Sequence, residues 1–340
     1  MENILLKLSC RRRCKGFALL VLLIAIFTVS QYTLKNRASS ALASVGDFFW
    51  LDLFHSKYFI PRDSIIMPQH ISYLIQPERS CNNEAYIAVL IPSHPKDGLK
   101  RTIIRKTWGH ALIQDQWPHA KLGKHADIFF LLGRTSNQLE HQSVEQEAHT
   151  YADMIIGDFD DTYRNLSIKM LFGLNWIAKN CAETKFLVKI DQDTFVDFPQ
   201  LMNLLLNNEY KLHNSVLGKL YYSPWVLTSG KWKNDPNEYP FSMFPTYAGG
   251  PCYILSTDII APIVNMSQYI PYMSLEDVYI TGVLLKALGA PKYDLPQLHN
   301  FPEEETFCDF IADEKRLLST TRLSTDQLSE LWQTITRGTC

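Results

Sequence analysis

The sequence predicts an α/β fold in which helices flank a mostly parallel central sheet. From residue 85 onward, short apolar runs alternate with segments that carry apolar residues at helical spacing. The apolar runs are continuous, which is typical of strands buried on both faces of a parallel sheet. No fixed-period repeat and no break in composition divides this part of the 340-residue chain, so we expect a single α/β domain here.

The elements follow one another in a regular order. Strands are expected at 85–91, 127–133, from 154–156, 186–190 and 216–222, and helices at 98–108, 138–151, 161–180, 199–208, 257–266, 276–288 and 325–336. The segment 223–247 is rich in Trp, Pro and Tyr and is expected to be a loop. The helix 98–108 would place Leu99 on its apolar side and Arg101 and Arg105 on another side.

Residues 1–34 have a different character. Basic residues within 11–15 precede an apolar run, 16–29, that weakens toward Leu34. About 17 apolar residues can suffice for a membrane span, and a preceding positive cluster keeps the amino terminus in the cytosol. We therefore expect a cytosolic tail (1–15), a transmembrane signal-anchor (16–34), a stem (35–80) and a lumenal domain (81–340). A signal peptide cleaved near 41–43 is the competing interpretation.

Two features agree with a lumenal location. Asn165 and Asn265 each begin an Asn-x-Ser tripeptide, the acceptor pattern for N-glycosylation. An odd set of cysteines lies beyond the apolar run: Cys81, Cys181, Cys252, Cys308 and Cys340. In an oxidising compartment this set implies at least one free or intermolecular thiol, and the sequence leaves the pairing open. The net charge of −2 gives no indication of a nucleic-acid partner.

Two aspartates follow the apolar run 186–190. If the strand continues to its last residues, Asp191 and Asp193 share one face and Gln192 points away from them. In an open α/β sheet, ligands bind beyond the carboxyl ends of the strands. Carboxylate oxygens there suit Mg²⁺ or Mn²⁺, whose remaining ligands are often substrate phosphates. The alternative is a solvated Asp-rich turn at the end of a strand.

A second pair of acids, Glu276 and Asp277, opens the helix 276–288. Ser274 followed by Asp277 is a capping-box pattern, and acids favour helix amino termini, so a purely structural role is one interpretation. The other interpretation is a general base, a carboxylate that removes the proton of an acceptor hydroxyl as a new bond forms.

Five motifs, taken in order, carry a resemblance to a known family. They are Arg101–Trp108, Asp158–Leu166 with Lys169, Lys189–Asp193, Tyr239–Pro240 and Phe244–Gly250 with Tyr253 and Ser256, and Glu276–Tyr279 with Gly282. In this order they resemble the β-1,3-galactosyltransferase family, which also contains β-1,3-N-acetylglucosaminyltransferases and is related to the fringe enzymes. The resemblance covers residues 85–290.

The resemblance implies a GT-A type glycosyltransferase, a single-pass type II protein of the Golgi membrane whose catalytic domain is lumenal. Such an enzyme transfers a hexose, here expected to be galactose, from a UDP-sugar to a glycan hydroxyl on a glycoprotein or glycolipid. The linkage would be β-1,3, formed with inversion. Asp191 and Asp193 would hold Mn²⁺ (or Mg²⁺) with the donor diphosphate, and Asp277, paired with Glu276, would be the base.

The resemblance also touches candidate donor-binding residues. Arg101 and Arg105 suit the donor phosphates, but a solvated basic helix face explains them equally. Lys189 is expected at the diphosphate or in an ion pair with a neighbouring acid. Gly249 and Gly250 would let the backbone approach the donor closely, or would form a plain turn.

Three aromatic residues are interpreted in the same way. Trp232, Tyr239 and Tyr247 are expected to stack on sugar rings, with Trp232 and Tyr247 on the acceptor, and packing beneath a loop is the alternative for all three. Trp108 is expected in the core rather than in the site.

Two positions depart from the family pattern. Gln192 stands where the family usually has an acid between the two aspartates. No His is present near Thr321, where many members carry a further metal ligand, and His299 is the nearest upstream alternative. This second departure motivates an alternative function, a non-catalytic glycosyltransferase-like binding protein or partner subunit of the secretory pathway.

Overall fold

The structure is a computed structural model that describes residues 58–67, 72–298, 307–311 and 317–340. The chain divides into two compact units, 1–46 and 47–340, and all described residues belong to the second. The predicted cytosolic tail and signal-anchor lie outside the described residues, as does His299. Among the residues that are described, we find no helix long and apolar enough to span a bilayer.

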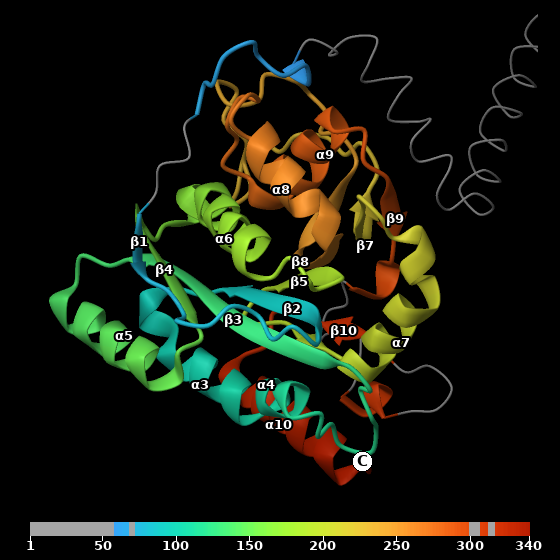
Figure 1. The fold of residues 1–340 in the computed structure, drawn as a ribbon. Coiled ribbons are helices and arrows are strands. Elements are labelled where there is room, and N and C mark those ends of the chain that lie inside the picture. The colour runs from blue at the N-terminus through green and yellow to red at the C-terminus, as the bar shows by residue number, and fades with distance from the viewer. Residues whose placement is uncertain (1–57, 68–71, 299–306, 312–316) are drawn as a thin grey trace, which may run out of the picture. The chain divides into compact units, whose positions relative to one another are not determined.

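A sheet of eight strands forms the centre of the second unit (Figure 1). In order across the sheet, the strands are β1 (Tyr73–Ile75), β4 (Met154–Asp160), β3 (His125–Arg134), β2 (Ala85–Pro92), β5 (Phe186–Ile190), β8 (Tyr247–Ser256), β7 (Val216–Tyr221) and β9 (Lys292–Asp294). The strands β4, β3, β2 and β5 are parallel, whereas β8 is antiparallel to both of its neighbours. Every residue of β2 and β5 is buried, as expected for strands covered on both faces. The predicted α/β fold with a mostly parallel sheet is confirmed.

Helices cover both faces of this sheet (Figure 1). One face carries α3 (Gly98–Lys106), α4 (Trp108–Ile113), α5 (Gln138–Tyr151), α7 (Phe198–Asn208) and α10 (Thr325–Arg337). The other face carries α6 (Leu166–Asn180), α8 (Thr257–Met266) and a π-helical segment, η5 (Val278–Leu284), that continues into α9 (Leu285–Ala287). The side chains of β2 divide between the two cores by strand alternation, with Val89 packed in the first and Leu90 in the second.

Strand β8 differs from the sequence-based expectation of a loop up to residue 247 followed by a helix at 257. Gly249, Gly250 and Pro251 in this strand are typical of turns, which hides it in the local sequence. In the fold, β8 lies between β5 and β7, and the N–H of Asp191 donates to the C=O of Pro251 over 2.9 Å. Long-range pairing therefore makes this segment a strand.

Helix α3 turns only part of its predicted apolar side toward the core, and it buries an arginine as well. Ile104 is 1% exposed, whereas Leu99 is 65% exposed and Arg101 is 0% exposed. The helix is interrupted at Thr107 (φ −118°, ψ −121°), so α4 begins at Trp108 instead of continuing α3. Trp108 is buried and stacks on Phe198 with 5.5 Å between ring centroids, which confirms it as a core residue.

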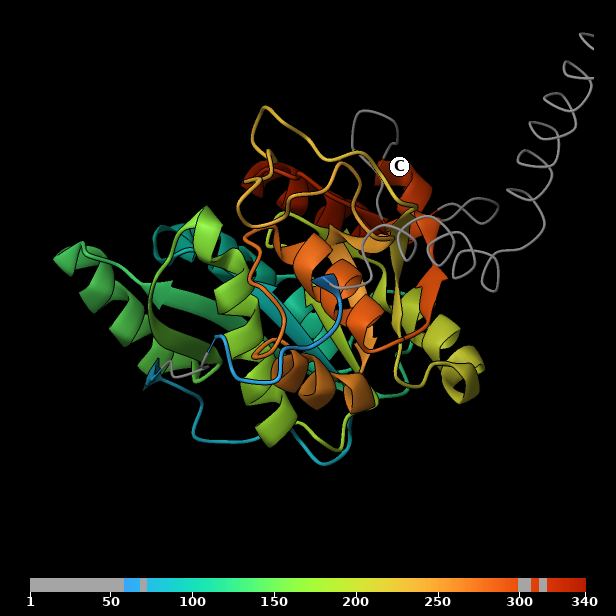
Figure 2. The same cartoon turned by 90° about the horizontal axis from the view of Figure 1, so that it is seen from above.

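Residues of the predicted stem, 35–80, also contact the folded unit. Phe59 is buried in the core, and the N–H of Arg62 donates to the C=O of Tyr269 over 2.9 Å. Figure 2 shows the segment 58–67, in blue, beside the orange helices. Strand β1 extends the sheet by pairing with β4.

The structure contains two disulfides, Cys81–Cys181 and Cys308–Cys340. Of the cysteines that the structure describes, Cys252 alone is unpaired, and it is buried in β8. The expectation of at least one unpaired thiol is therefore confirmed. Cys81–Cys181 joins the residues before β2 to the end of α6, across 100 residues of chain.

Candidate active site

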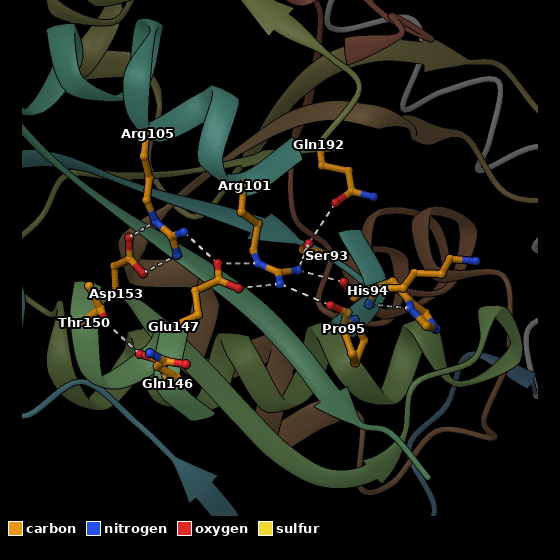
Figure 3. A network of polar contacts seen from close by, with 11 residues as sticks. Ser93, His94, Pro95, Arg101, Arg105, Gln146, Glu147, Thr150, Asp153 and Gln192 are labelled. Atoms are coloured by element: carbon orange, nitrogen blue, oxygen red, sulfur yellow. Dashed lines mark hydrogen bonds and ion pairs between the residues drawn. The ribbon is translucent and has the colours of Figure 1, made fainter. Parts of the chain in front are cut away.

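The predicted metal ligands lie at the carboxyl end of β5. The strand stops at Ile190, and residues 191–194 form a turn in which the N–H of Thr194 donates to the C=O of Asp191 over 3.0 Å. The strand therefore ends before both aspartates, which lie in a turn. Gln192 points toward the loop after β2, where it accepts a hydrogen bond from Ser93 over 2.8 Å (Figure 3).

The two aspartates of this turn influence each other. Burial, followed by the charge of Asp191, raises the pKa of Asp193 above its usual value. A divalent cation would relieve such repulsion, and two carboxylates leave room in its shell for water and phosphate oxygens. Within the described part of the chain, no group of three His, Cys, Asp or Glu residues could hold a metal ion. The donor set therefore fits Mg²⁺ or Mn²⁺ as a site that water and substrate complete.

The segment expected to carry the family's late histidine lies beside this turn. Strand β10 (Ser319–Thr320) pairs with β6 (Phe195–Val196), and the N–H of Leu323 donates to the C=O of Asp193 over 2.9 Å. Thr321 is buried, and its hydroxyl lies 2.8 Å from that of Thr194. A threonine bonded within the protein thus occupies this place next to the aspartate turn.

Lys189 lies among the acids of the site. Its ammonium donates to Oδ1 of Asp191 over 2.6 Å and to the C=O of Gly250, and it lies 3.8 Å from Oε2 of Glu276. Burial alone would lower the pKa of Lys189, but the charges of Asp191 and Glu276 outweigh burial and raise it. Of the two interpretations of Lys189, the structure contains the ion pair with neighbouring acids.

Asp277 reaches the same edge of the sheet from the start of η5. Its Oδ2 accepts from the N–H of Gly250 over 3.0 Å, and its Oδ1 accepts from the N–H of Val278 over 2.9 Å. Because the C=O of Gly250 accepts from Lys189, this one residue of β8 links Asp277 to the aspartate turn. Burial raises the pKa of Asp277, whereas its two backbone hydrogen bonds act in the opposite direction. Asp277 thus caps its helical segment and also lies near the other acids of the site. We call Asp191, Asp193, Glu276 and Asp277 the acidic cluster.

Glu276, the neighbour of Asp277, is enclosed by protein. It is 4% exposed, and its Oε1 accepts a hydrogen bond from the Tyr253 hydroxyl over 2.6 Å. Burial raises the pKa of Glu276 to about 7, although the charge of Lys189 opposes the shift. Asp277 is half-buried by comparison, so it is the more accessible acid of the pair.

The two arginines expected at the donor phosphates lie in a different cluster (Figure 3). Arg101 donates to both carboxylate oxygens of Glu147 and to Ser93, His94 and Pro95, so all five of its N–H groups have acceptors in the protein. Arg105 donates to Glu147 and Asp153. Neither arginine forms a solvated basic face, and neither has its guanidinium directed to the acidic cluster.

Lys100 is a cation of α3 whose charge acts on the aspartate turn. Its charge lowers the pKa of Asp193, against the larger effects of burial and Asp191. Sequence reasoning missed Lys100 because it selected the arginines of the same motif. Helical periodicity offered a signal, since Lys100 and Arg101 differ by one residue and therefore point in different directions.

Tyrosines face the acidic cluster from three elements. Tyr247, predicted to bind the acceptor, stacks on Tyr221 with 5.3 Å between ring centroids. Burial, followed by the charge of Asp277, raises the pKa of both. Burial and then the charges of Asp277 and Glu276 raise the pKa of Tyr163 to about 12. Tyr163 and Tyr221 were not singled out from the sequence, although Tyr163 lies inside one of the five motifs.

Trp232, the other residue predicted to bind the acceptor, lies in the long loop between β7 and β8 and is 47% exposed. Two cations lie near its ring, with Nζ of Lys231 at 5.8 Å and Cζ of Arg322 at 5.9 Å from the ring centroid. Arg322 follows Thr321 directly and also lowers the pKa of Tyr221, so this loop and the segment after β10 meet beside the tyrosines.

The two predicted glycosylation sites differ in accessibility. Asn265 is exposed in the last turn of α8. The side-chain amide of Asn165 donates to the C=O of Asp160 over 2.9 Å, and Ser167 of the same tripeptide is buried. Asn265 is therefore the better placed of the two, and modification of either remains a prediction.

Comparison with known proteins gives consistent results. The galactosyltransferase family model matches residues 99–296. A β-1,3-galactosyltransferase 5 of Gorilla gorilla gorilla is 31% identical over 258 residues, which cover 74% of this chain and 83% of that protein. A β-1,3-galactosyltransferase 1 of Mus musculus is 28% identical over 275 residues, 78% of this chain and 79% of that protein. The apo structure of the bifunctional glycosyltransferase WbbM, at 12% identity, covers 77% of this chain and 53% of that chain with a TM-score of 0.43, too low to carry weight.

The acidic cluster lies at the carboxyl end of a parallel strand, where α/β enzymes usually bind their ligands. The relatives named above are glycosyltransferases, which gives the class of enzyme. The chain belongs to the galactosyltransferase family. The resemblance carried by the five motifs is thereby confirmed. The matched region contains Asp191, Asp193 and Asp277.

Proposed function

We propose that this protein transfers galactose from UDP-galactose to a glycan hydroxyl, in β-1,3 linkage and with inversion, on a GT-A type fold. One observation carries the proposal: Asp277 and Asp191 lie at the same edge of the sheet, joined through the backbone of Gly250 and the ammonium of Lys189. A base for the acceptor and acids for a cation on the donor side are thereby close enough to serve one reaction. The names of the relatives suggest the sugar and the linkage.

In this mechanism Asp277 accepts the proton of the acceptor hydroxyl. The acceptor oxygen forms a bond to the anomeric carbon, and the bond from that carbon to the diphosphate oxygen breaks, so that UDP leaves with the electron pair. One displacement of this kind inverts the configuration. Burial raises the pKa of Asp277, which brings a carboxylate closer to the basicity that proton removal needs.

The residues on the donor side would bind and orient the nucleotide. Asp191 and Asp193 would hold Mn²⁺ or Mg²⁺, which when bound supplies positive charge against the departing diphosphate. Lys100 would add a positive charge on the same side, while Lys189 holds Asp191 in place through its hydrogen bond. Tyr163, Tyr221 and Tyr247 offer ring faces and hydroxyls to the sugars.

For the location we propose a type II protein of the Golgi membrane with the catalytic domain in the lumen. The basic cluster followed by the apolar run at 16–34 supports this topology. The two disulfides support it too, because disulfides persist mainly in oxidising compartments. Protease treatment of sealed microsomes tests the topology: the domain beyond residue 81 should be protected, and its digestion would contradict the proposal.

The proposed activity is tested with a panel of UDP-sugars, each with Mn²⁺ and simple glycan acceptors, by measuring released UDP and product linkage. We expect transfer from UDP-galactose, loss of the Mn²⁺-dependent part in Asp193→Ala, and wild-type activity in the exposed control Asp326→Asn. Transfer that is equal in Asp193→Ala and wild type would contradict the role of the aspartate turn.

A second candidate function is that of a non-catalytic sugar- or protein-binding relative in the same compartment. The observation that favours it is the buried Thr321, at the place where the resemblance implies a histidine. A ligand that binds only the folded state raises apparent stability, so UDP with Mn²⁺ should raise the melting temperature of an enzyme. Absence of any shift at millimolar UDP, together with absence of transfer, would favour the binding protein.

A further inference from the structure

The amide of Gln192 bridges two groups in the loop between β2 and α3. Its Oε1 accepts from the Ser93 hydroxyl over 2.8 Å, and its Nε2 donates to Oδ2 of Asp97 over 2.6 Å. Both partners follow β2, the strand that pairs with β5, so Gln192 ties the Asp191–Asp193 turn to the neighbouring loop.

The direction of these two hydrogen bonds is fixed by the partners. The Ser93 hydroxyl accepts from Nη1 of Arg101 over 2.9 Å, so its single proton is available for Gln192. An ionised Asp97 only accepts, and therefore requires a donor from residue 192. Position 192 must accept at one end and donate at the other, which an amide does and an ionised carboxylate does not. Gln192 and Asp97 are thus chemically matched.

The loop that receives Gln192 is itself held from two sides. Arg101 donates to the C=O groups of His94 and Pro95 and is anchored on Glu147, which also binds Arg105 (Figure 3). On the opposite face of the sheet, Nζ of Lys169 donates to the C=O of Ser93 over 2.6 Å and is paired with Asp161 at 2.8 Å. Ser93 is 2% exposed. Gln192 therefore forms its hydrogen bond with a residue, Ser93, that other contacts hold in place.

We propose that Gln192 and Asp97 are positioning residues for the metal-binding turn, and that Ser93, held by Arg101, orients the Gln192 amide. The metal part of this inference rests on the proposed function, whereas the ordering of the turn does not. A glutamate introduced at position 192 would face Asp97 without a proton between the two carboxylates.

The test exchanges the two groups with isosteric substitutions: Gln192→Glu, Asp97→Asn and the double variant. In the double variant, the carboxylate at position 192 accepts from Ser93 and from the amide at position 97, so the bridge is restored with its polarity reversed. The double variant has the same net charge as the wild type, whereas Gln192→Glu adds one negative charge and Asp97→Asn removes one. The set therefore separates positioning from a simple effect of charge on cation binding.

Two readouts are measured on the full chain. The first is hydrogen exchange of the amides of residues 191–194 without metal or nucleotide. The second is the Mn²⁺ concentration that gives half of the thermal protection by UDP. We expect Gln192→Glu to speed the exchange about tenfold and to raise the Mn²⁺ requirement about tenfold, because partners behind metal ligands affect affinity on that scale. Asp97→Asn and the double variant should remain within about threefold of wild type, since each keeps a donor facing an acceptor.

A charge effect alone gives the opposite order: Gln192→Glu would bind Mn²⁺ most tightly, Asp97→Asn most weakly, and exchange would not change. That result would overturn the inference. If Gln192→Glu lowers global stability, Ser93→Ala, which removes one hydroxyl, is measured in its place, and unchanged exchange there would also overturn the inference. Absence of UDP binding and transfer in every protein, wild type included, with the exchange pattern as expected, would reject the proposed function and leave the positioning of the turn standing.

Discussion

Arg101 and Lys189 are both buried cations at the carboxyl ends of the central strands, but their surroundings differ in charge balance. Around Arg101, the two arginines of α3 face two carboxylates, Glu147 and Asp153. Around Lys189, the one ammonium is surrounded by Asp191, Glu276 and Asp277, all of which raise its pKa. In the first cluster, the positive and negative charges are equal in number. The second cluster has more carboxylates than cations, which is the charge balance that the proposed cation site requires.

The largest effect is expected in the acid-rich cluster, from Asp277→Asn. Removal of a general base typically lowers turnover by about 10²–10⁴-fold. Protection by UDP and Mn²⁺ in a thermal melt should remain, because the substitution leaves the aspartate turn unchanged. Steady-state kinetics beside the control Asp326→Asn checks this. Full turnover by Asp277→Asn would reject Asp277 as the base.

The balanced cluster should respond in stability instead. Arg101→Met leaves Glu147 with one arginine fewer and releases two loop carbonyls, and breaking a buried pair from one side typically lowers the free energy of unfolding by about 3–5 kcal/mol. Urea unfolding measures the change. The matched control is Arg134→Met, whose two salt bridges are exposed, and we expect little change there. Equal losses in the two variants would contradict a special role of the buried cluster.

The pH dependence of stability distinguishes the clusters next. The pKa of Glu276 rises from 4.5 to about 7 in the folded protein. Between these values the folded state retains a proton that the unfolded state has lost, so an increase in pH through this window lowers the free energy of unfolding, by about 3 kcal/mol in total from this group. The difference between wild type and Glu276→Gln, measured from pH 4 to 8, isolates it. A difference that does not change with pH would contradict the raised pKa.

The smallest effect is expected at Gly250, which connects Asp277 to Lys189. A Cβ at residue 250 would lie 3.2 Å from Oδ2 of Asp277, so Gly250→Ala should displace that carboxylate by a few tenths of an ångström. We expect turnover to fall about tenfold, with little change in UDP binding. At Gly98, an added Cβ would meet only ordinary contacts, at 3.5 Å or more, and Gly98→Ala should keep its activity. Unchanged turnover in Gly250→Ala would show that Asp277 tolerates the shift.

The sequence was most informative where structure is local. The helical spacing of Leu166, Met170, Leu174 and Ile177 predicted α6, and all but Leu166 are fully buried. Strand β8 escaped prediction because its Gly-Gly-Pro segment has the composition of a turn, and only the pairing with β5 and β7 makes it extended. The ion pair of Arg101 could not be predicted for a similar reason: its partner Glu147 is 46 residues away on another helix.

In the candidate site, too, some residues could be predicted from local motifs and others could not. Asp191, Asp193 and Asp277 were found because they lie in motifs of a recognised family, and the structure brings the segments together. Lys100, Tyr163 and Tyr221 were not singled out, because their electrostatic interactions with Asp193 and Asp277 arise only in the folded chain. The bridge from Gln192 to Asp97 spans 95 residues, and no local pattern reveals it.

Gly250 uses both of its backbone polar groups inside the site, the N–H for Asp277 and the C=O for Lys189. Any sliding of β8 along its neighbours would therefore disturb the acceptor end and the nucleotide end in a single movement. In the proposed mechanism, the backbone of this one glycine connects the base to the residues on the donor side, so an acceptor that displaced β8 would also displace the groups that hold the nucleotide.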